Sequence, residues 1–174
     1  METATIEAPK STHVGRTTDK DHYETPEALW VKLQRDFEFN VDCAASLENT
    51  KCADFYSLER SFLTAPVSEF RFKRCWLNCP FSQKLDFLSR AALIRSVADV
   101  VATIVPNNAR ETDWWWLWVK NHADEIVNLS PRVYYELDGV PQKNVPFSSC
   151  LVIYYPRIVG AHYGPPRETY WQWN

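Results

Sequence analysis

The sequence predicts an α/β fold of the Rossmann-like type, in which a mostly parallel sheet carries helices on both faces. Strand-like segments alternate with segments of helical periodicity along the chain. One of them, DVVATIVP (99–106), is an almost continuous apolar run, as is typical of a strand buried on both faces. The 174 residues, 45% of them hydrophobic, suffice for one compact domain with a ligand cleft.

The first elements are a helix, a short strand and a second short helix. In YETPEALWVKLQRDF (23–37), Thr25 is a suitable helix cap and Pro26 suits the first helical position. The residues that recur there at helical spacing are Leu29, Trp30, Leu33 and Phe37. FEFNVDCAAS (37–46) predicts a short buried strand that ends on Asp42, and ENTKCADFY (48–56) predicts a short helix.

The second half of the chain alternates in the same way. Strands are expected at RCWLN (74–78), DVVATIVP (99–106), EIVNLS (125–130) and SSCLVIYYP (148–156). Helices are expected at SQKLDFLSRAALIRS (82–96) and TDWWWLWVKNHA (112–123). The buried face of the first of these helices should hold Leu85, Leu88, Ala92 and the stem of Arg95. Polar residues follow three strands, at 42–46, 78–81 and 106–108, where ligands bind in such sheets.

The flanks of this pattern define three parts of the chain. Residues 1–20 are polar and lack apolar periodicity, so we expect a flexible arm or a lid that orders on binding. The domain proper is expected at residues 21–160, followed by an aromatic tail at residues 161–174.

The run WWWLW (114–118) cannot place every tryptophan in one core. At about 100° per residue, Trp114 and Trp118 share a helix face, so Trp115 or Trp116 should point outward or pack on the aromatic tail. Core and tail packing is the favoured interpretation. The alternatives are a stacking platform for unpaired bases and a contact in a homodimer.

Composition excludes several classes of function. The net charge of −3 gives no overall attraction for nucleic acid, so a nucleic-acid partner needs a local basic patch. Candidates for such a patch are Arg71, Lys73, Arg74, Arg110, Arg132 and Lys143. With four glycines, the chain has neither G-x-G-x-x-G nor a phosphate-binding loop, although residues 44–46 could still allow close backbone approach to a ligand.

The cysteines and the apolar runs bear on the cellular compartment of the protein. The five cysteines are scattered, without C-x-x-C pairs or a histidine cluster, so we expect no metal site and free thiols in a reducing, cytoplasmic setting. No apolar run reaches the roughly 18 residues that span a membrane.

The stretch WLNCPFSQ (76–83) carries the candidate chemistry. Methyl transfer to an exocyclic amine needs acceptors for both N–H groups, because the amine lone pair is delocalised into the base. The Asn78 side-chain oxygen and the Cys79 carbonyl can accept, Pro80 restrains Cys79 to an extended conformation, and Phe81 offers a face to a flipped base. A strand end followed by a proline turn is the structural alternative.

Six segments together resemble the phage-type DNA N-6-adenine methyltransferases, a Dam-like family, between about residues 21 and 156. They are DHYETP, FEFNVDCAAS, NTKCADFY, CWLNCPFS, VVATIVPNNARETDWW and SPRVYYELDGVPQKNVPFSSCLVIYYP. The resemblance implies a class I methyltransferase sheet, S-adenosylmethionine as cofactor and a DNA duplex with a flipped adenine as substrate. A phage-encoded enzyme would act in the bacterial host cytoplasm.

The resemblance also implies roles for individual residues. The catalytic motif is matched by Asn78, Cys79, Pro80 and Phe81. The cofactor-binding segments are matched by Tyr23, Thr25, Pro26, Asp42, Ala44, Ala45, Ser46 and Asn49, with Asp42 expected at the amino-acid or ribose end. DNA contacts are expected from Ser82, Arg110, Arg132 and Lys143, with base readout from residues 130–148.

The chain departs from the family pattern at two positions. Cys79 stands where the family usually has proline, and Ser61, with Glu59 nearby, stands where it tends to have an acidic residue at the cofactor adenine. Cys79 precedes the proline, whereas the nucleophile of cytosine-C5 methylation follows one, so packing of a small thiol is the favoured role.

We therefore expect a DNA adenine-N6 methyltransferase that uses S-adenosylmethionine. One alternative is a cytosine-N4 or RNA-adenine methyltransferase with the same motif. The other is a catalytically silent family member that binds nucleic acid or a host protein.

Overall fold

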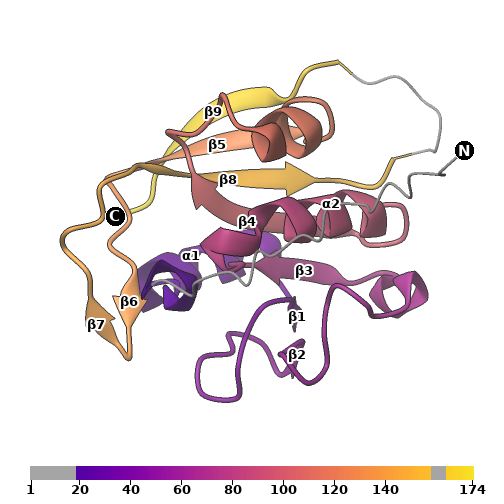
Figure 1. Ribbon diagram of the computed structural model, residues 1–174, viewed down its shortest axis with the longest axis horizontal. Coiled ribbons are helices and arrows are strands. Elements are labelled where there is room, and N and C mark those ends of the chain that lie inside the picture. The colour runs from indigo at the N-terminus through magenta and orange to yellow at the C-terminus, as the bar shows by residue number, and fades with distance from the viewer. Residues whose placement is uncertain (1–18, 158–163) are drawn as a thin grey trace, which may run out of the picture.

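A central seven-stranded sheet organises the computed structural model, which describes residues 19–157 and 164–174 (Figure 1). The strands are β1 (Val41–Asp42), β2 (Asp54–Phe55), β3 (Arg74–Leu77), β4 (Val100–Pro106), β5 (Glu125–Ser130), β8 (Ser149–Tyr154) and β9 (Arg167–Gln172). Their order is β2-β1-β3-β4-β8-β5-β9. β8 runs antiparallel to β4 and β5, and the other neighbouring pairs are parallel. The predicted α/β fold with a mostly parallel sheet is confirmed.

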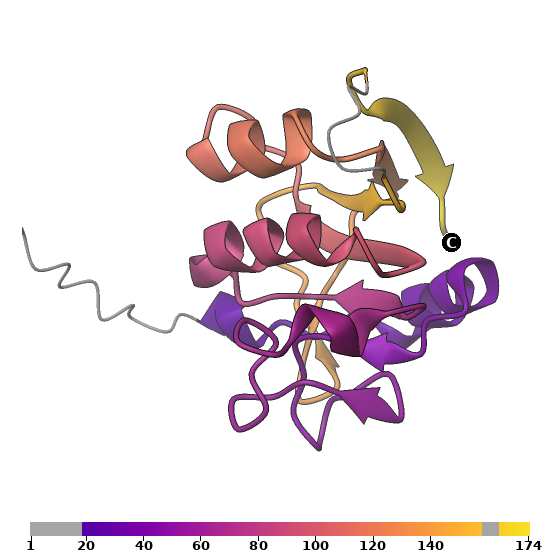
Figure 2. The same ribbon diagram turned by 90° about the vertical axis from the view of Figure 1, so that its right-hand side faces the viewer.

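The helices cover both faces of this sheet. The α-helices are α1 (Glu27–Phe37) and α2 (Lys84–Ile94), the π-helix is η4 (Trp115–Lys120), and the 3-10 helices are η1 (Asp19–His22), η2 (Val67–Phe70) and η3 (Phe81–Gln83). Figure 2 shows α1 on one side of the sheet and α2 with η4 on the other. The central strands β4 and β8 are therefore buried on both faces, whereas the edge strand β9 is mostly exposed.

β4 illustrates how one strand serves two cores. All seven of its residues are buried, and alternate side chains point to opposite faces. Val101 and Val105 join the core under α2 and η4, whereas Ala102 and Ile104 join the core under α1. The apolar run that predicted this strand is thus explained by burial on both sides.

The buried stripe of α2 differs from the prediction. Its buried residues are Phe87, Leu88, Ala91 and Ile94. Leu85 is 46% exposed, because the buried face of α2 is centred on residues 87, 91 and 94 and Leu85 lies outside it. Arg95 is buried as expected, where it pairs with Asp124.

The prediction of a short helix at residues 48–56 is wrong. Residues 47–49 form a turn and residues 54–55 form β2. The Lys51 amide donates to the Asp42 carboxylate (3.0 Å) and the Tyr56 amide donates to the Asp42 carbonyl (2.8 Å). These bonds hold the segment against β1 and leave no helical hydrogen-bond ladder.

Two β elements of the second half lie outside the sequence prediction. A hairpin of β6 (Glu136–Leu137) and β7 (Val140–Pro141) turns at Asp138 and Gly139, whose φ angles of 49° and 74° suit an Asp-Gly turn. β9 pairs with β5 and adds part of the aromatic tail to the sheet. Residues 1–18 of the expected arm, and residues 158–163, lie outside the described residues.

The tryptophans of η4 divide as the helical spacing requires. Trp115 is 4% exposed and joins the core under α2. Trp116 is 49% exposed, with the Lys120 ammonium 3.5 Å from its ring centroid, which confirms that one of the two points outward. Trp171 and Trp173 pack in the core on the other face of the sheet, away from η4.

Candidate active site

A cavity of about 300 Å³ lies at the carboxyl ends of β1 and β3. Four segments form its walls: residues 21–25, 42–51, 56–63 and 76–87. The sequence-predicted site residues that line it are Tyr23, Thr25, Asp42, Ala44, Ala45, Ser46, Asn49, Asn78 and Pro80. The fold therefore brings together residues that are separated in the sequence, at the strand ends where ligands bind in open α/β sheets.

Asp42 closes the cavity at the end of β1. Its side chain is 3% exposed, and its two carboxylate oxygens accept hydrogen bonds from the Ala44 amide (3.3 Å) and the Lys51 amide (3.0 Å). Burial raises the pKa of this carboxyl, and the two amide bonds oppose that rise. Asp42 can offer an acceptor to a hydroxyl or ammonium group of a ligand.

In the loop after Asp42, the backbone amides of residues 44–46 already have hydrogen-bond acceptors within the protein. The amides of Ala44, Ala45 and Ser46 donate to the Asp42 carboxylate, the Tyr56 carbonyl (3.0 Å) and the Asn49 side-chain oxygen (2.7 Å) respectively. The loop therefore offers a ligand the contour of small side chains, and its amides are not free to bind phosphate.

Asn78 follows β3, and its amide group is held by partners distant in sequence. Its Nδ2 donates to the Tyr23 carbonyl (2.7 Å) and to the Thr25 hydroxyl (3.3 Å). Its Oδ1 is buried and has no hydrogen-bond partner within the described part of the chain. A buried acceptor without a donor is uncommon, and this one belongs to a residue that lines the cavity.

Thr25 lines the cavity and does not cap α1, so the prediction that it caps this helix is wrong. The N-cap position is occupied by Pro26, and no side chain caps this helix. The Thr25 hydroxyl instead accepts from Asn78. Pro26 does not line the cavity, and it fixes the point at which the chain leaves the cavity wall and becomes α1.

Cys79 and Phe81 lie beside the cavity and do not line it. Cys79 is 2% exposed, and burial raises the pKa of its thiol to about 12. Its thiol is therefore protonated at neutral pH, as a packing role requires. The Phe81 ring meets the rings of Tyr23 and Tyr135 edge to face, at centroid distances of 6.0 and 5.7 Å.

Lys84 is a neighbour of this turn that sequence reasoning missed. Its ammonium donates to the Phe81 carbonyl and lies 4.9 Å from the Phe81 ring centroid and 5.6 Å from that of Trp114. Burial lowers the pKa of this amine. A lysine at the first position of α2 opposes the helix dipole, which is the signal that could have identified it.

The four residues expected to contact DNA do not gather at the cavity. The Ser82 amide donates to the Asp21 carboxylate (2.8 Å), directly after the turn at residues 78–81. Arg132 and Lys143 are exposed on either side of the β6–β7 hairpin, and Arg132 donates to the Val145 carbonyl (3.1 Å).

Arg110 is paired within the protein. Its guanidinium donates to Glu168 of β9 (2.6 Å) and to the Asn107 side-chain oxygen (2.9 Å), and it lies over the Trp115 ring. Any contact that Arg110 makes with DNA must compete with this ion pair.

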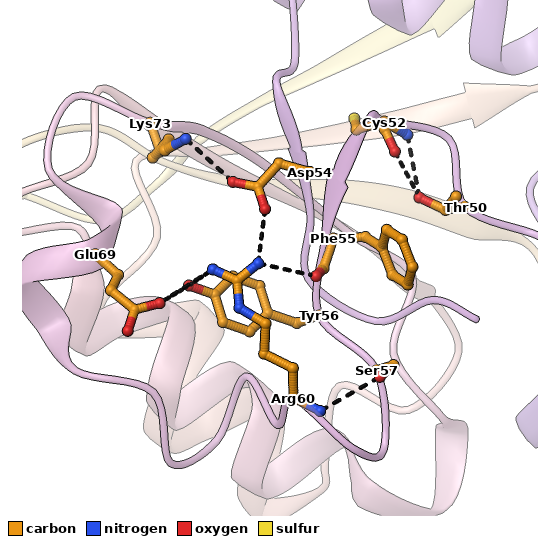
Figure 3. Close-up of polar contacts among 9 residues, drawn as sticks. All are labelled: Thr50, Cys52, Asp54, Phe55, Tyr56, Ser57, Arg60, Glu69 and Lys73. Carbon is orange, nitrogen blue, oxygen red and sulfur yellow. Dashed lines mark hydrogen bonds and ion pairs between the residues drawn. The ribbon is translucent and has the colours of Figure 1, made fainter. Parts of the chain in front are cut away.

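The outer wall of the cavity comes from residues 56–63, a segment in which only Ser61 had been considered as a possible cofactor contact. Its lining residues are Tyr56, Ser57, Leu58, Ser61, Phe62 and Leu63. Ser61 contributes a hydroxyl where an acidic residue was expected from the family pattern. Figure 3 shows the polar contacts that surround the first half of this segment.

No group of three or more His, Cys, Asp or Glu side chains in residues 19–157 and 164–174 is arranged to hold a metal ion. Among the helices of the same residues, none has the length and apolar character needed to cross a membrane.

Comparison with known proteins gives consistent matches. The family model of the DNA N-6-adenine-methyltransferase (Dam) matches residues 12–154. A DNA N-6-adenine-methyltransferase of Haemophilus phage HP1 (strain HP1c1) is 29% identical over 162 residues, which cover 89% of this chain and 88% of the phage protein. A DNA N-6-adenine-methyltransferase of Escherichia phage T1 is 26% identical over 121 residues, which cover 69% of this chain and 49% of that protein.

Proposed function

The chain belongs to the DNA N-6-adenine-methyltransferase (Dam) family, and from this premise we propose that it methylates N6 of an adenine flipped out of a DNA duplex, with S-adenosylmethionine as the methyl donor. The observation that carries the proposal is the buried Asn78 oxygen beside a cavity at the strand ends, an oxygen to which no group of residues 19–157 or 164–174 donates. The donor supplies an electrophilic methyl group on a sulfonium.

The residues of the cavity suit this cofactor. Its volume of about 300 Å³ is at the lower end of the range for small-molecule sites, roughly 300–1,000 Å³. Asp42 provides a carboxylate, Ala44, Ala45 and Ser46 provide small side chains, and residues 56–63 provide a wall that includes apolar side chains. Tyr23 and Thr25 would contact the cofactor on the side next to Asn78.

Asn78 and Cys79 would orient the adenine amine. Because Nδ2 of Asn78 is engaged by Tyr23 and Thr25, its Oδ1 is left to accept one N–H of the amine. The Cys79 carbonyl would accept the other, which turns the lone pair of N6 toward the methyl group. The proton of the methylated amine would leave to water, so no general base is required.

Phe81 would stack on the flipped base. Stacking of a base on an aromatic ring is worth about 1–3 kcal/mol. The ring is held by Tyr23, Tyr135 and the Lys84 ammonium, so its orientation is fixed before the base arrives. Ser82, at the start of the following helix, would lie near the flipped nucleotide.

DNA readout would come from the β6–β7 hairpin and its surroundings. Arg132 and Lys143 are exposed there and would contact phosphates, with Arg110 a further contact once released from Glu168. This small surface predicts relaxed sequence specificity, and a sharp, long recognition site for the monomer would contradict it.

The test is the identity of the methylated product. We expect label from radioactive S-adenosylmethionine to enter unmethylated DNA and to appear in N6-methyladenine after nucleoside digestion. Label in N4-methylcytosine, or in RNA alone, would establish one of the alternative methyltransferases. Absence of both methyl transfer and calorimetric binding of the cofactor would leave a silent member of the family.

A further inference from the structure

The loop at residues 57–61 forms the outer wall of the cavity, and its backbone hydrogen bonds are local. The Ser57 amide donates to the Arg60 carbonyl (3.0 Å), and the Ser57 hydroxyl accepts from the amides of Glu59 (3.2 Å) and Arg60 (3.3 Å). These bonds set the shape of the loop. Backbone bonds tie the chain to β1 and its following loop just before residue 57, where the Tyr56 amide donates to the Asp42 carbonyl (2.8 Å) and the Tyr56 carbonyl accepts from the Ala45 amide (3.0 Å). Any further attachment of residues 57–61 to β2 and η2 must come from side chains.

The side chain of Arg60 makes that attachment (Figure 3). Its guanidinium donates to Asp54 of β2 (2.7 Å), to Glu69 of η2 (3.1 Å) and to the Phe55 carbonyl (3.3 Å). It also lies 4.1 Å from the centroid of the Tyr56 ring, and the Tyr56 hydroxyl donates to Glu69 (2.7 Å). One exposed ion pair contributes little, but a planar guanidinium with several simultaneous partners is held in one orientation.

The clamped loop faces the cavity. Tyr56, under the guanidinium, is 2% exposed and lines the cavity. Leu58, at the tip of the loop, lines it too and is 98% exposed. The side chains of Phe62 and Leu63 line the cavity as well. Tyr56 and Phe62 are already buried in the core, so a ligand that fills the cavity would bury further apolar surface mainly at Leu58.

We infer that Arg60 is a positioning residue for the cofactor: by clamping Tyr56, Asp54 and Glu69 it holds the loop at residues 57–61 in place before the cofactor binds. This inference rests on the proposed function. Ordering a loop during binding costs free energy that a pre-ordered loop avoids, so the clamp raises affinity without touching the ligand.

The first test compares Arg60→Met with Arg71→Met by isothermal titration with S-adenosylmethionine. Arg71 is a matched control, because its guanidinium also lies over an aromatic ring, that of Phe72 (5.8 Å), and it does not line the cavity. We expect the Kd of Arg60→Met to rise about tenfold and that of Arg71→Met to stay within about twofold of wild type.

The second test is hydrogen exchange of the amides at residues 57–61 in the cofactor-free protein. We expect faster exchange in Arg60→Met than in wild type or Arg71→Met, and recovery of protection when cofactor is added. Tyr56→Phe keeps the ring and loses the bond to Glu69. It should raise the cofactor Kd and speed amide exchange at residues 57–61, each by less than Arg60→Met does. It serves as the test if Arg60→Met does not fold by circular dichroism.

The outcomes separate the inference from the proposed function. If wild type and Arg60→Met bind the cofactor equally, or if exchange at residues 57–61 is unchanged, the inference is overturned and the proposed function stands. If wild type binds no cofactor, the proposed function fails and the inference fails with it.

Discussion

Asn78 shows how a single side chain can be oriented before its ligand arrives. The two groups that hold its Nδ2 belong to Tyr23 and Thr25, which lie 55 and 53 positions away in the chain. Because those bonds fix the amide plane, the position of Oδ1 is set by the fold. Acceptors fixed in this way need no reorganisation during the reaction.

The sequence identified some of these residues for the right reason and others for the wrong one. Asn78 and Asp42 were expected at one rim because Asp42 ends one strand and Asn78 lies at the end of another, and strand ends meet at one edge of the sheet. Thr25 was expected both at the cofactor and as a helix cap, since threonine before proline is a local cap signature. Its bond to Asn78 depends on tertiary structure, which local patterns do not contain.

Asp42 gives a prediction about pH at this scale. Burial raises the pKa of its carboxyl in the folded protein above the value in the unfolded chain. The folded state therefore holds the proton more tightly, and the stability linked to Asp42 is complete below the unfolded pKa and is lost as pH rises through the folded pKa. Wild type should thus lose stability relative to Asp42→Asn over that interval.

Urea denaturation of both proteins at a series of pH values measures this difference. A difference in the free energy of unfolding that stays constant across the interval, or that moves in favour of wild type as pH rises, would contradict the assignment.

At the scale of elements, η4 divides a run of aromatic residues between core and solvent. Helical spacing predicted that one of Trp115 and Trp116 points outward, and the structure assigns that place to Trp116. Spacing could not choose between them, because the choice depends on how η4 sits against α2 and the sheet.

This division predicts unequal effects of two neighbouring substitutions. Trp115→Ala should lower the free energy of unfolding by about 3–5 kcal/mol, because it empties a buried site. Trp116→Ala should cost at most about 1 kcal/mol, mainly through the lost contact with Lys120. Chemical denaturation monitored by far-UV circular dichroism compares the two, and similar losses would show that the packing of η4 is misassigned.

The elements that the sequence missed are those that depend on pairing. β2, β6 and β7 are two-residue strands, too short to show alternation. β9 has six residues, but only pairing with β5 identifies it as a strand, because its side chains are mostly exposed. The ion pair of Glu168 with Arg110 could not be predicted for the same reason.

For the whole molecule, the alternation of strands and helices predicted where the cavity lies. An alternating α/β pattern places polar segments at one edge of the sheet, and the cavity lies there. The outer wall at residues 57–61 could not be predicted, because its position depends on how Arg60 meets Asp54 and Glu69. The sequence pattern thus predicted the edge of the sheet at which the cavity lies, and tertiary contacts complete its walls.

Methyl transfer by Asn78→Ala tests the central claim most directly. The variant is compared with wild type and with Asn121→Ala, a matched change at an exposed asparagine outside the site. Each protein receives radiolabelled S-adenosylmethionine and unmethylated DNA, and its cofactor Kd is measured in parallel.

We expect the kcat of Asn78→Ala to fall about 10²–10³-fold, because one acceptor of the amine is removed, and we expect the variant still to bind the cofactor. Asn121→Ala should methylate at the wild-type rate. Label that continues to enter N6-methyladenine at the wild-type rate in Asn78→Ala would contradict the account.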